Sequence, residues 1–385
     1  MEQYKETTVA SFKHIKSLDG LRGIAILLVM VFHQIVVEGA TDFDRAFLGL
    51  FDFGWCGVDL FFVLSGFLIT GILLDTRQEV GYFKKFYARR FLRIFPIYYA
   101  LLAFSLLILP MFDHPKVANF GRIGGDEFYY IVYLQNFAIA MANTFRHGIL
   151  DVTWSLAIEE QFYIVWPFVV ILFSRKSLLK FCGILFISSF LIRSVYLLMD
   201  GFSLPAYVLT PMRLEGLVAG AGVAAIIRTI SLNSRVVKIN YILLGVCSMS
   251  VVLLWGGTGG AWNSLVMQTV GYSIVSLAFA SLLLLIVYKS LSGRRQPILE
   301  SRILCELGKY SYAIYLFHLP IRAVFRDVLF KPEDFFTFFG SVVPAQFVFV
   351  LMSSVVTFIA AMLSWNLFEK HFLRLKKYYS YESRG

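Results

Sequence analysis

The chain has 385 residues, of which 58% are hydrophobic and only 16% charged. Its mean hydropathy is +0.72, and its apolar residues come in blocks of about 20, the length that a membrane-spanning helix needs. These properties exclude an ordinary soluble domain and predict an all-α, polytopic integral membrane protein. The net charge of +10 comes from basic residues spread over many loops, so we expect membrane lipid as a partner and no nucleic acid.

The hydrophobic blocks predict about ten spans. They lie near residues 20–38, 57–75, 92–112, 156–174, 178–198, 208–228, 239–256, 266–289, 309–329 and 341–366. With the N-terminus placed in the cytoplasm, the inner segments carry 25 of the 35 Lys and Arg residues and the outer segments carry five. This asymmetry follows the positive-inside rule and predicts that both termini are cytoplasmic.

The predicted organisation is a cytoplasmic segment 1–19, a transmembrane domain 20–366 and a basic cytoplasmic tail 367–385. The first 19 residues lack an apolar stretch and a small-residue cleavage site, so we expect the first span to be retained rather than cleaved as a signal peptide. The four cysteines do not have the spacing of a disulfide framework or a metal cage, and no metal site is expected.

The first span carries two polar residues eleven positions apart, Arg22 and His33. Eleven residues at about 100° each place both on one helix face, about 16 Å apart. Arg22 could snorkel to the cytoplasmic surface and His33 could be a hydrogen-bonded packing residue. Alternatively, a neutral His33 serves as a general base in a buried cavity. Asp19, three residues before Arg22, is expected to pair with its guanidinium.

The second cluster is Arg90 and Arg93, which share a face where the third predicted span begins. Basic residues at this point also serve as positive-inside anchors, which is the simpler interpretation of the neighbouring Lys84, Lys85 and Arg89. Two stacked guanidinium groups can grip phosphates through forked hydrogen bonds. The pair therefore favours a phosphorylated ligand from the cytosol.

The third cluster lies where the chain re-enters the membrane, between Asp151 and Pro167. Thr153 or Ser155 is expected to cap this helix. Of the adjacent Glu159 and Glu160, only one is expected to face the interior, and the choice is Glu159, with Tyr163 one turn later and Trp154 beside it. Trp154 can be an interfacial anchor or a platform for a sugar ring.

Further polar residues lie within predicted spans. For Asp59 and the arginines at 193 and 213, we expect ion pairs that hold helices together. The stripe formed by Ser311, Tyr315, His318 and Arg322 has no assigned role.

Together these segments resemble the acyltransferase-3 family, the membrane acyltransferases typified by bacterial O-antigen and exopolysaccharide O-acetylases. Each segment is a weak signal alone, whereas five in order over most of the chain are specific. They are Leu18–Ala25 with His33, Gly57–Ile69, Arg89–Pro96, Thr153–Tyr163 and Leu307–His318.

The resemblance implies catalytic roles for His33, Arg22 and Glu159, and binding of the acyl-CoA donor by Arg90 and Arg93. It also implies about ten core helices and an acceptor hydroxyl at the outer side, for which we assign Trp154, Tyr163 and Asp59 to acceptor binding. Acyl-CoA is then a co-substrate, and no bound cofactor is expected.

The expected activity is membrane O-acylation, with acetyl as the first choice, of a cell-envelope polysaccharide or lipid-linked glycan at the inner (cytoplasmic) membrane. His33 can deprotonate the acceptor or carry the acyl group itself. Acylation of a small natural product such as a macrolide is an alternative, and a proton-coupled transporter or flippase is an alternative of another class. The larger family members have an appended hydrolase-like domain, so we expect transfer to finish within this domain or to involve a separate protein of glycan assembly.

Overall fold

The computed structural model describes residues 14–111, 124–200 and 204–381. The regular elements in these ranges are helical, apart from an isolated bridge between Phe338 and Ser341. Residues 1–13 of the predicted N-terminal segment and 382–385 of the predicted tail lie outside the described residues. The prediction of an all-α fold is confirmed.

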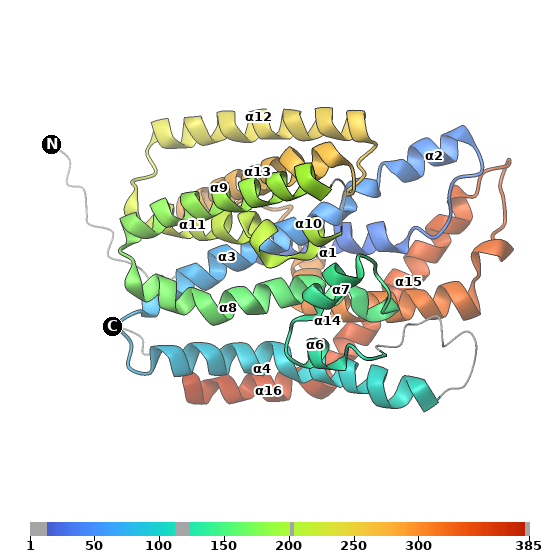
Figure 1. The fold of residues 1–385 in the computed structure, drawn as a ribbon, viewed down its shortest axis with the longest axis horizontal. Coiled ribbons are helices and arrows are strands. Elements are labelled where there is room, and N and C mark those ends of the chain that lie inside the picture. Colours follow the sequence, from blue (N-terminus) through green and yellow to red (C-terminus); the bar gives the residue numbers. More distant parts are fainter. Residues whose placement is uncertain (1–13, 112–123, 201–203, 382–385) are drawn as a thin grey trace.

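Most of the long helices run in similar directions in Figure 1, whereas α15 (Val343–Ser364) crosses them obliquely. These helices carry most of the apolar sequence. They are α1 (Lys16–Gln34), α3 (Gly57–Thr76), α4 (Tyr82–Ala103), α8 (Trp154–Leu172), α9 (Arg175–Asp200), α11 (Glu215–Thr229), α12 (Ser234–Thr258), α13 (Tyr272–Leu291), α14 (Arg302–Val324) and α15 (Val343–Ser364). The short α-helices are α2 (Asp42–Gly49), α6 (Glu127–Ile131), α7 (Gln135–Ala142), α10 (Pro205–Val208) and α16 (Lys370–Arg374).

Short 3-10 and π segments connect or extend these helices. They are η1 (Asp52–Cys56), η2 (Phe104–Ile108), η3 (Leu109–Met111), η4 (Gly148–Thr153), η5 (Thr210–Met212), η6 (Met267–Gly271), η7 (Phe325–Leu329), η8 (Pro332–Asp334), η9 (Trp365–Glu369) and η10 (Leu375–Tyr379).

Among the described residues, eight helical segments are long and apolar enough to cross a membrane. Each corresponds to one of the ten predicted spans, so the prediction of a polytopic membrane protein is confirmed. The other two predicted spans are α11, which has 15 residues, and α14, which has 23 residues but carries polar side chains. Both pack against other long helices: α11 contacts α3 and α9, and α14 contacts α1 and α15. Protein neighbours therefore surround the short helix α11 and the polar side chains of α14. The side of the membrane on which the termini lie stays a prediction.

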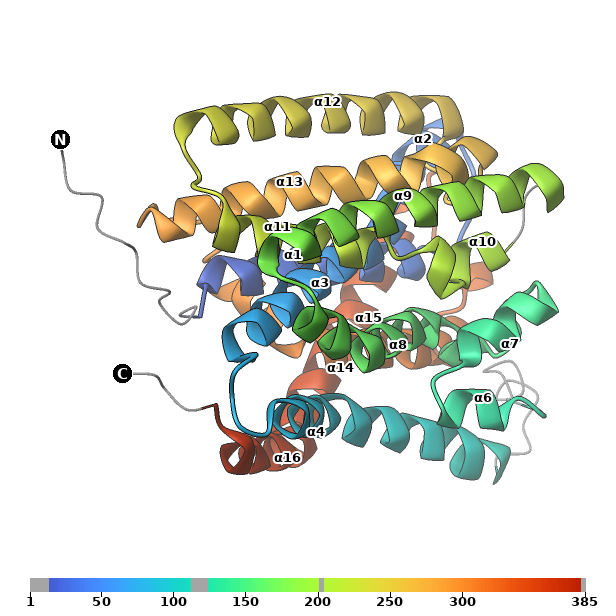
Figure 2. The same ribbon diagram turned by 60° about the vertical axis from the view of Figure 1, so that its left-hand side comes forward.

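Helix α4 begins earlier than predicted. The third span was expected from residue 92, whereas the helix starts at Tyr82. The basic stretch before residue 92, which the charge pattern assigns to a cytoplasmic segment, continues the helix, so Arg90 and Arg93 lie well inside it. The last segment, α16 with η10, lies along α4 (Figures 1 and 2).

Close backbone contacts join α1 to α14. A Cβ atom added at Gly308 of α14 would lie 1.9 Å from the carbonyl oxygen of Asp19 in α1. Small residues at such crossings let two membrane helices approach until their backbones touch. The same arrangement recurs where Gly220 of α11 meets Val63 of α3, at 1.9 Å. These contacts set the spacing of the central helices.

We therefore predict that Gly308→Ala lowers the free energy of unfolding by about 1–3 kcal/mol, the usual cost of overpacking. Unfolding in mixed micelles measures the change. The matched control is Gly245→Ala on α12, where an added Cβ meets nothing within 4 Å. Equal behaviour of the two variants would contradict the tight α1–α14 contact.

Candidate active site

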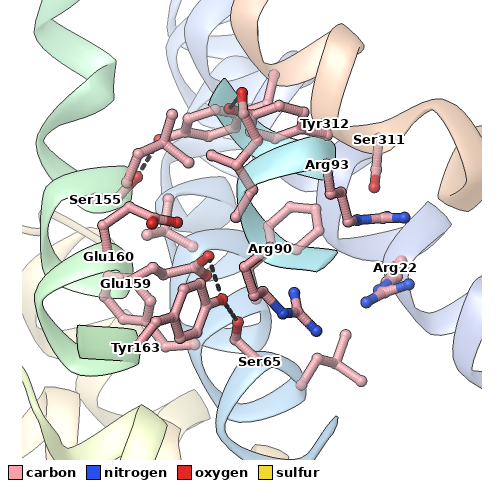
Figure 3. A pocket seen from close by; sticks show the side chains of 17 residues that line it. Arg22, Ser65, Arg90, Arg93, Ser155, Glu159, Glu160, Tyr163, Ser311 and Tyr312 are labelled. Carbon is pink, nitrogen blue, oxygen red and sulfur yellow. Dashed lines mark hydrogen bonds between the residues drawn. The ribbon is translucent and has the colours of Figure 1, made fainter. Parts of the chain in front are cut away.

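A cavity opens between α1, α3, α4, α8 and α14 (Figure 3). It contains about 780 Å³ of space free of protein atoms, counting its connection to solvent. Its wall combines apolar side chains with an unusual number of charged and hydroxyl groups for the interior of a helix bundle. The charged and hydroxyl-bearing residues on the wall are Arg22, Ser65, Arg90, Arg93, Ser155, Glu159, Glu160, Tyr163, Ser311, Tyr312 and Tyr315.

Three arginines from two helices meet in this cavity. Arg22 comes from α1, and Arg90 and Arg93 come from adjacent turns of α4; their guanidinium groups point toward one region in Figure 3. Within the part of the chain that the structure describes, none of the three has an ion pair or hydrogen bond with another residue. Arg90 does lie over the ring of Tyr163, 5.4 Å from its centroid.

Unpaired guanidinium groups inside a bundle are costly, and each offers several N–H donors in a fixed fork. Three of them facing one space form a site suited to an anion with several oxygen atoms, such as a group of phosphates. The predicted ion pair of Arg22 with Asp19 does not form: Asp19 pairs with His14 at 2.7 Å, and its charge acts on Arg22 only from a longer distance. Arg22 is thereby available to the cavity.

The tail adds another cation near this site. Arg89 of α4 donates hydrogen bonds to the backbone carbonyls of Lys376 and Tyr379, at 3.4 and 3.3 Å. These bonds hold η10 against α4, and they bring Lys376 within electrostatic range of Arg90 and Arg93. Sequence reasoning did not connect this segment to the cavity, because nearly 290 positions separate Arg89 from its partners.

Carboxylates line the opposite wall, on α8 (Figure 3). The hydroxyl of Tyr163 donates to Glu159 Oε2 at 2.8 Å and also hydrogen-bonds with the hydroxyl of Ser65. The expectation that only Glu159 faces inward is wrong, since Glu160 lies on the wall too. Successive residues on a helix are about 100° apart, and a cavity bordered by both α4 and α14 covers more of the α8 surface than one narrow face.

The start of α8 is bound to α14 rather than capped by its own hydroxyl groups. Thr153 donates to the carbonyl of Leu150 at 2.7 Å, and Ser155 lies 2.6 Å from the hydroxyl of Tyr315. Tyr315 also donates to the carbonyl of Val152 at 2.8 Å. Thr153 does occupy the N-cap position of α8, but neither it nor Ser155 makes the predicted capping hydrogen bond, because their hydroxyls donate to carbonyl groups of η4.

His33 lies at the last turn of α1 and contacts a second histidine, His318 of α14. The Nδ1 atom of His33 is 3.2 Å from Nε2 of His318, and the ring centroids are 5.0 Å apart. His33 is not on the cavity wall; Tyr315 is, and its ring centroid lies 5.6 Å from that of His318. Tyr315 and His318 thus connect the cavity to His33. Their spacing on one helix face was visible in the sequence, but their partners were not.

Two residues assigned to acceptor binding lie elsewhere. Trp154 is buried, with ring centroids 4.6 Å from Tyr207 and 6.3 Å from Phe62, and it does not line the cavity. Asp59 is buried and pairs with Arg213 at 2.9 Å. A second buried pair joins Arg193 of α9 to Glu215 of α11, as expected for arginines that hold helices together. Tyr163 does line the cavity.

The structural role of Asp59 is testable. We predict that Asp59→Asn lowers the free energy of unfolding by about 3–5 kcal/mol, because Arg213 is left as an uncompensated buried charge. Replacing both with leucine should recover much of this loss. Arg45→Ala, which breaks an exposed pair with Asp42, is the control and should change stability by less than about 1 kcal/mol. If Asp59→Asn unfolds like the parent protein, the pair does not stabilise the bundle.

These features define the class: a polytopic membrane protein with a cationic cavity inside its helix bundle and a histidine pair beside it. The comparisons identify its family. The acyltransferase domain of the acyltransferase-3 type matches residues 15–365, and the chain belongs to this family. The resemblance drawn from the sequence motifs is confirmed.

The curated relatives described next are all named as O-acetyltransferases. The chain is 28% identical to the peptidoglycan O-acetyltransferase OatA of Listeria monocytogenes, over 84% of this chain and 52% of that protein. It is 29% identical to the putative peptidoglycan O-acetyltransferase YrhL of Bacillus subtilis, over 93% and 55%, and 27% identical to the O-acetyltransferase OatA of Staphylococcus aureus, over 80% and 51%. The chain thus spans about half the length of these relatives. No solved structure matches.

Proposed function

We propose that this protein is a membrane O-acyltransferase that moves an acetyl group from cytosolic acetyl-CoA to a hydroxyl of a cell-wall polysaccharide. The observation that carries the proposal is that Arg22, Arg90 and Arg93, none of which has an ion pair or hydrogen bond among the described residues, converge in one cavity. The wall of this cavity includes Tyr315, whose ring contacts His318, the partner of His33. Membership of the acyltransferase family supports it.

The donor fits the charge of the cavity. Coenzyme A carries phosphates at one end and the thioester at the end of a long, flexible arm. Phosphates at the three guanidinium groups receive forked, charge-assisted hydrogen bonds. The arm can then extend along the hydroxyl groups of Ser155 and Tyr315, which lie on the wall near the histidine pair. This geometry holds the nucleotide at the basic mouth while the acyl group travels inward.

The chemical step needs a base and a route for one proton. In direct transfer, the acceptor hydroxyl attacks the thioester carbonyl carbon, a C–O bond forms and the C–S bond breaks. The hydroxyl proton passes to Nε2 of His33 and then to the departing thiolate, which leaves as free CoA thiol. An acyl-histidine intermediate splits the same exchange into two steps.

The acceptor class rests on the relatives. Three of them are named as O-acetyltransferases, two of these with peptidoglycan in the name. We assign a cell-wall or other envelope polysaccharide as the acceptor. We assign the cytoplasmic membrane as the location, because acetyl-CoA is cytosolic and these polymers lie on the outer side of that membrane. Tyr163 and Glu159 stay candidates for contact with substrate, since both line the cavity.

Release of free CoA thiol tests the function. We predict that the purified protein, reconstituted with acetyl-CoA and a panel of envelope glycans, releases thiol only when an acceptor glycan is present. His33→Ala should lose this activity by a factor of about 100 or more, the usual contribution of a general base. His371→Ala, on the exposed surface of α16, is the control and should retain it.

Normal turnover by His33→Ala would overturn the catalytic assignment. A folded protein that neither binds acetyl-CoA nor releases thiol would contradict acyl transfer and favour transport of a glycan or anion. Turnover with a macrolide and not with glycans would move the acceptor to small natural products.

The arginines should act on donor binding. We predict that Arg93→Ala and Arg90→Ala each weaken acetyl-CoA binding about 10- to 100-fold, which corresponds to about 1.5–3 kcal/mol for hydrogen bonds to a charged group. Equilibrium binding in detergent measures it. The matched control is Lys84→Ala, an exposed basic residue on the same helix, which should bind as the parent does. Equal affinity of Arg93→Ala and Lys84→Ala would place the phosphates elsewhere.

A further inference from the structure

The histidine that faces His33 is fully buried and has a fixed hydrogen-bond partner of its own. His318 lies inside α14 with no exposed surface. Its Nδ1 is 2.7 Å from the carbonyl oxygen of Tyr315. A carbonyl oxygen only accepts, so Nδ1 of His318 carries the hydrogen, and in the neutral ring Nε2 is left as an acceptor.

The same reasoning assigns the hydrogens of His33. Its Nδ1 is 3.0 Å from the carbonyl oxygen of Val29, one turn earlier on α1, and 3.2 Å from the accepting Nε2 of His318. Both neighbours are acceptors, so Nδ1 of His33 carries a hydrogen shared between them. In the neutral ring Nε2 of His33 is therefore unprotonated, and it has no hydrogen-bond partner among the residues that the structure describes.

We infer that His318 is a positioning residue for the reaction: it holds His33 in the Nδ1–H tautomer and orients its Nε2 as the proton acceptor. The inference rests on the proposed function and goes beyond it, because it assigns a role to a residue on another helix, 285 positions away. His33 is only partly buried and stands at the end of α1. Its Nδ1–H has one acceptor on its own helix, the Val29 carbonyl, and the second acceptor on α14 adds a restraint on the plane of the ring.

The role becomes most important when the proton moves. As Nε2 of His33 takes the hydroxyl proton, the ring becomes positively charged and its Nδ1–H becomes a stronger donor. Nε2 of His318 is placed to accept that stronger bond, while its own Nδ1–H remains on the Tyr315 carbonyl. No proton needs to pass to His318. Tyr315 also lines the cavity. The carbonyl that orients His318 therefore belongs to a residue beside the proposed acetyl-CoA site.

Two substitutions at one position separate positioning from packing. His318→Leu removes the acceptor and keeps an apolar side chain of similar reach. His318→Gln can present its amide oxygen near the former Nε2. We expect His318→Leu to lower kcat about 10- to 100-fold, the range found for partners that orient metal-ligating histidines, with little change in the KM for acetyl-CoA. His318→Gln should recover most of kcat.

A spectroscopic measurement tests the hydrogen bond without turnover. The ¹⁵N shifts of His33 in histidine-labelled protein report which ring nitrogen carries the hydrogen. The parent and His318→Gln should show the Nδ1–H form, and His318→Leu should show a mixture. Asn240→Leu is the control for loss of a buried polar side chain, since Asn240 of α12 bonds to the Ser281 carbonyl; it should leave kcat and the His33 spectrum unchanged.

Each result decides a different claim. An unchanged kcat in a folded His318→Leu variant, or an Nε2–H form of His33 in the parent, would overturn the positioning role. A fall in kcat of the same size in His318→Gln and Asn240→Leu would also overturn it, because packing alone would then explain the loss. A parent protein that shows the Nδ1–H form but transfers no acyl group would overturn the proposed function, and with it the catalytic part of this inference.

Discussion

The contact between α1 and α14 is the constraint on which the rest of the site depends. Gly308 lets the two backbones touch, with an added Cβ only 1.9 Å from the Asp19 carbonyl. Helix α1 carries Arg22, on the cavity wall, and His33, which contacts His318 of α14. If the two helices stood further apart, the 3.2 Å contact between the histidine rings would be lost, and the arginine would leave the cavity wall.

Charges inside this bundle fall into two groups with different consequences. Asp59 with Arg213 and Arg193 with Glu215 are buried ion pairs, and they join helices at the cost of desolvation. The cavity arginines have no such partner within the described ranges. A membrane protein retains unpaired cations at depth where they have a function, and the proposed donor phosphates would neutralise them. The buried pairs thus belong to the framework, and the three cavity arginines belong to the proposed site.

The sequence predicted the parts of this arrangement that depend on one helix at a time. The blocks of apolar residues indicated the spans, and the spacing of Arg22 and His33, or of Arg90 and Arg93, indicated shared faces. The sequence alone did not predict which residues of different helices contact one another. Periodicity does not reveal that His318 meets His33, or that Trp154 packs against Tyr207 away from the cavity. The early start of α4 was missed because the hydrophobic block that marks the span begins only after the charged residues of the helix.

The most direct test is a structure determined by electron cryomicroscopy of the full chain in lipid nanodiscs with a non-hydrolysable acetyl-CoA analogue. We predict density for the phosphates within hydrogen-bond distance of Arg22, Arg90 and Arg93, with the thioester end extending past Tyr315 towards Nε2 of His33. Donor density at any other surface, or a lipid headgroup on the three arginines when the analogue is saturating, would contradict a donor site in this cavity.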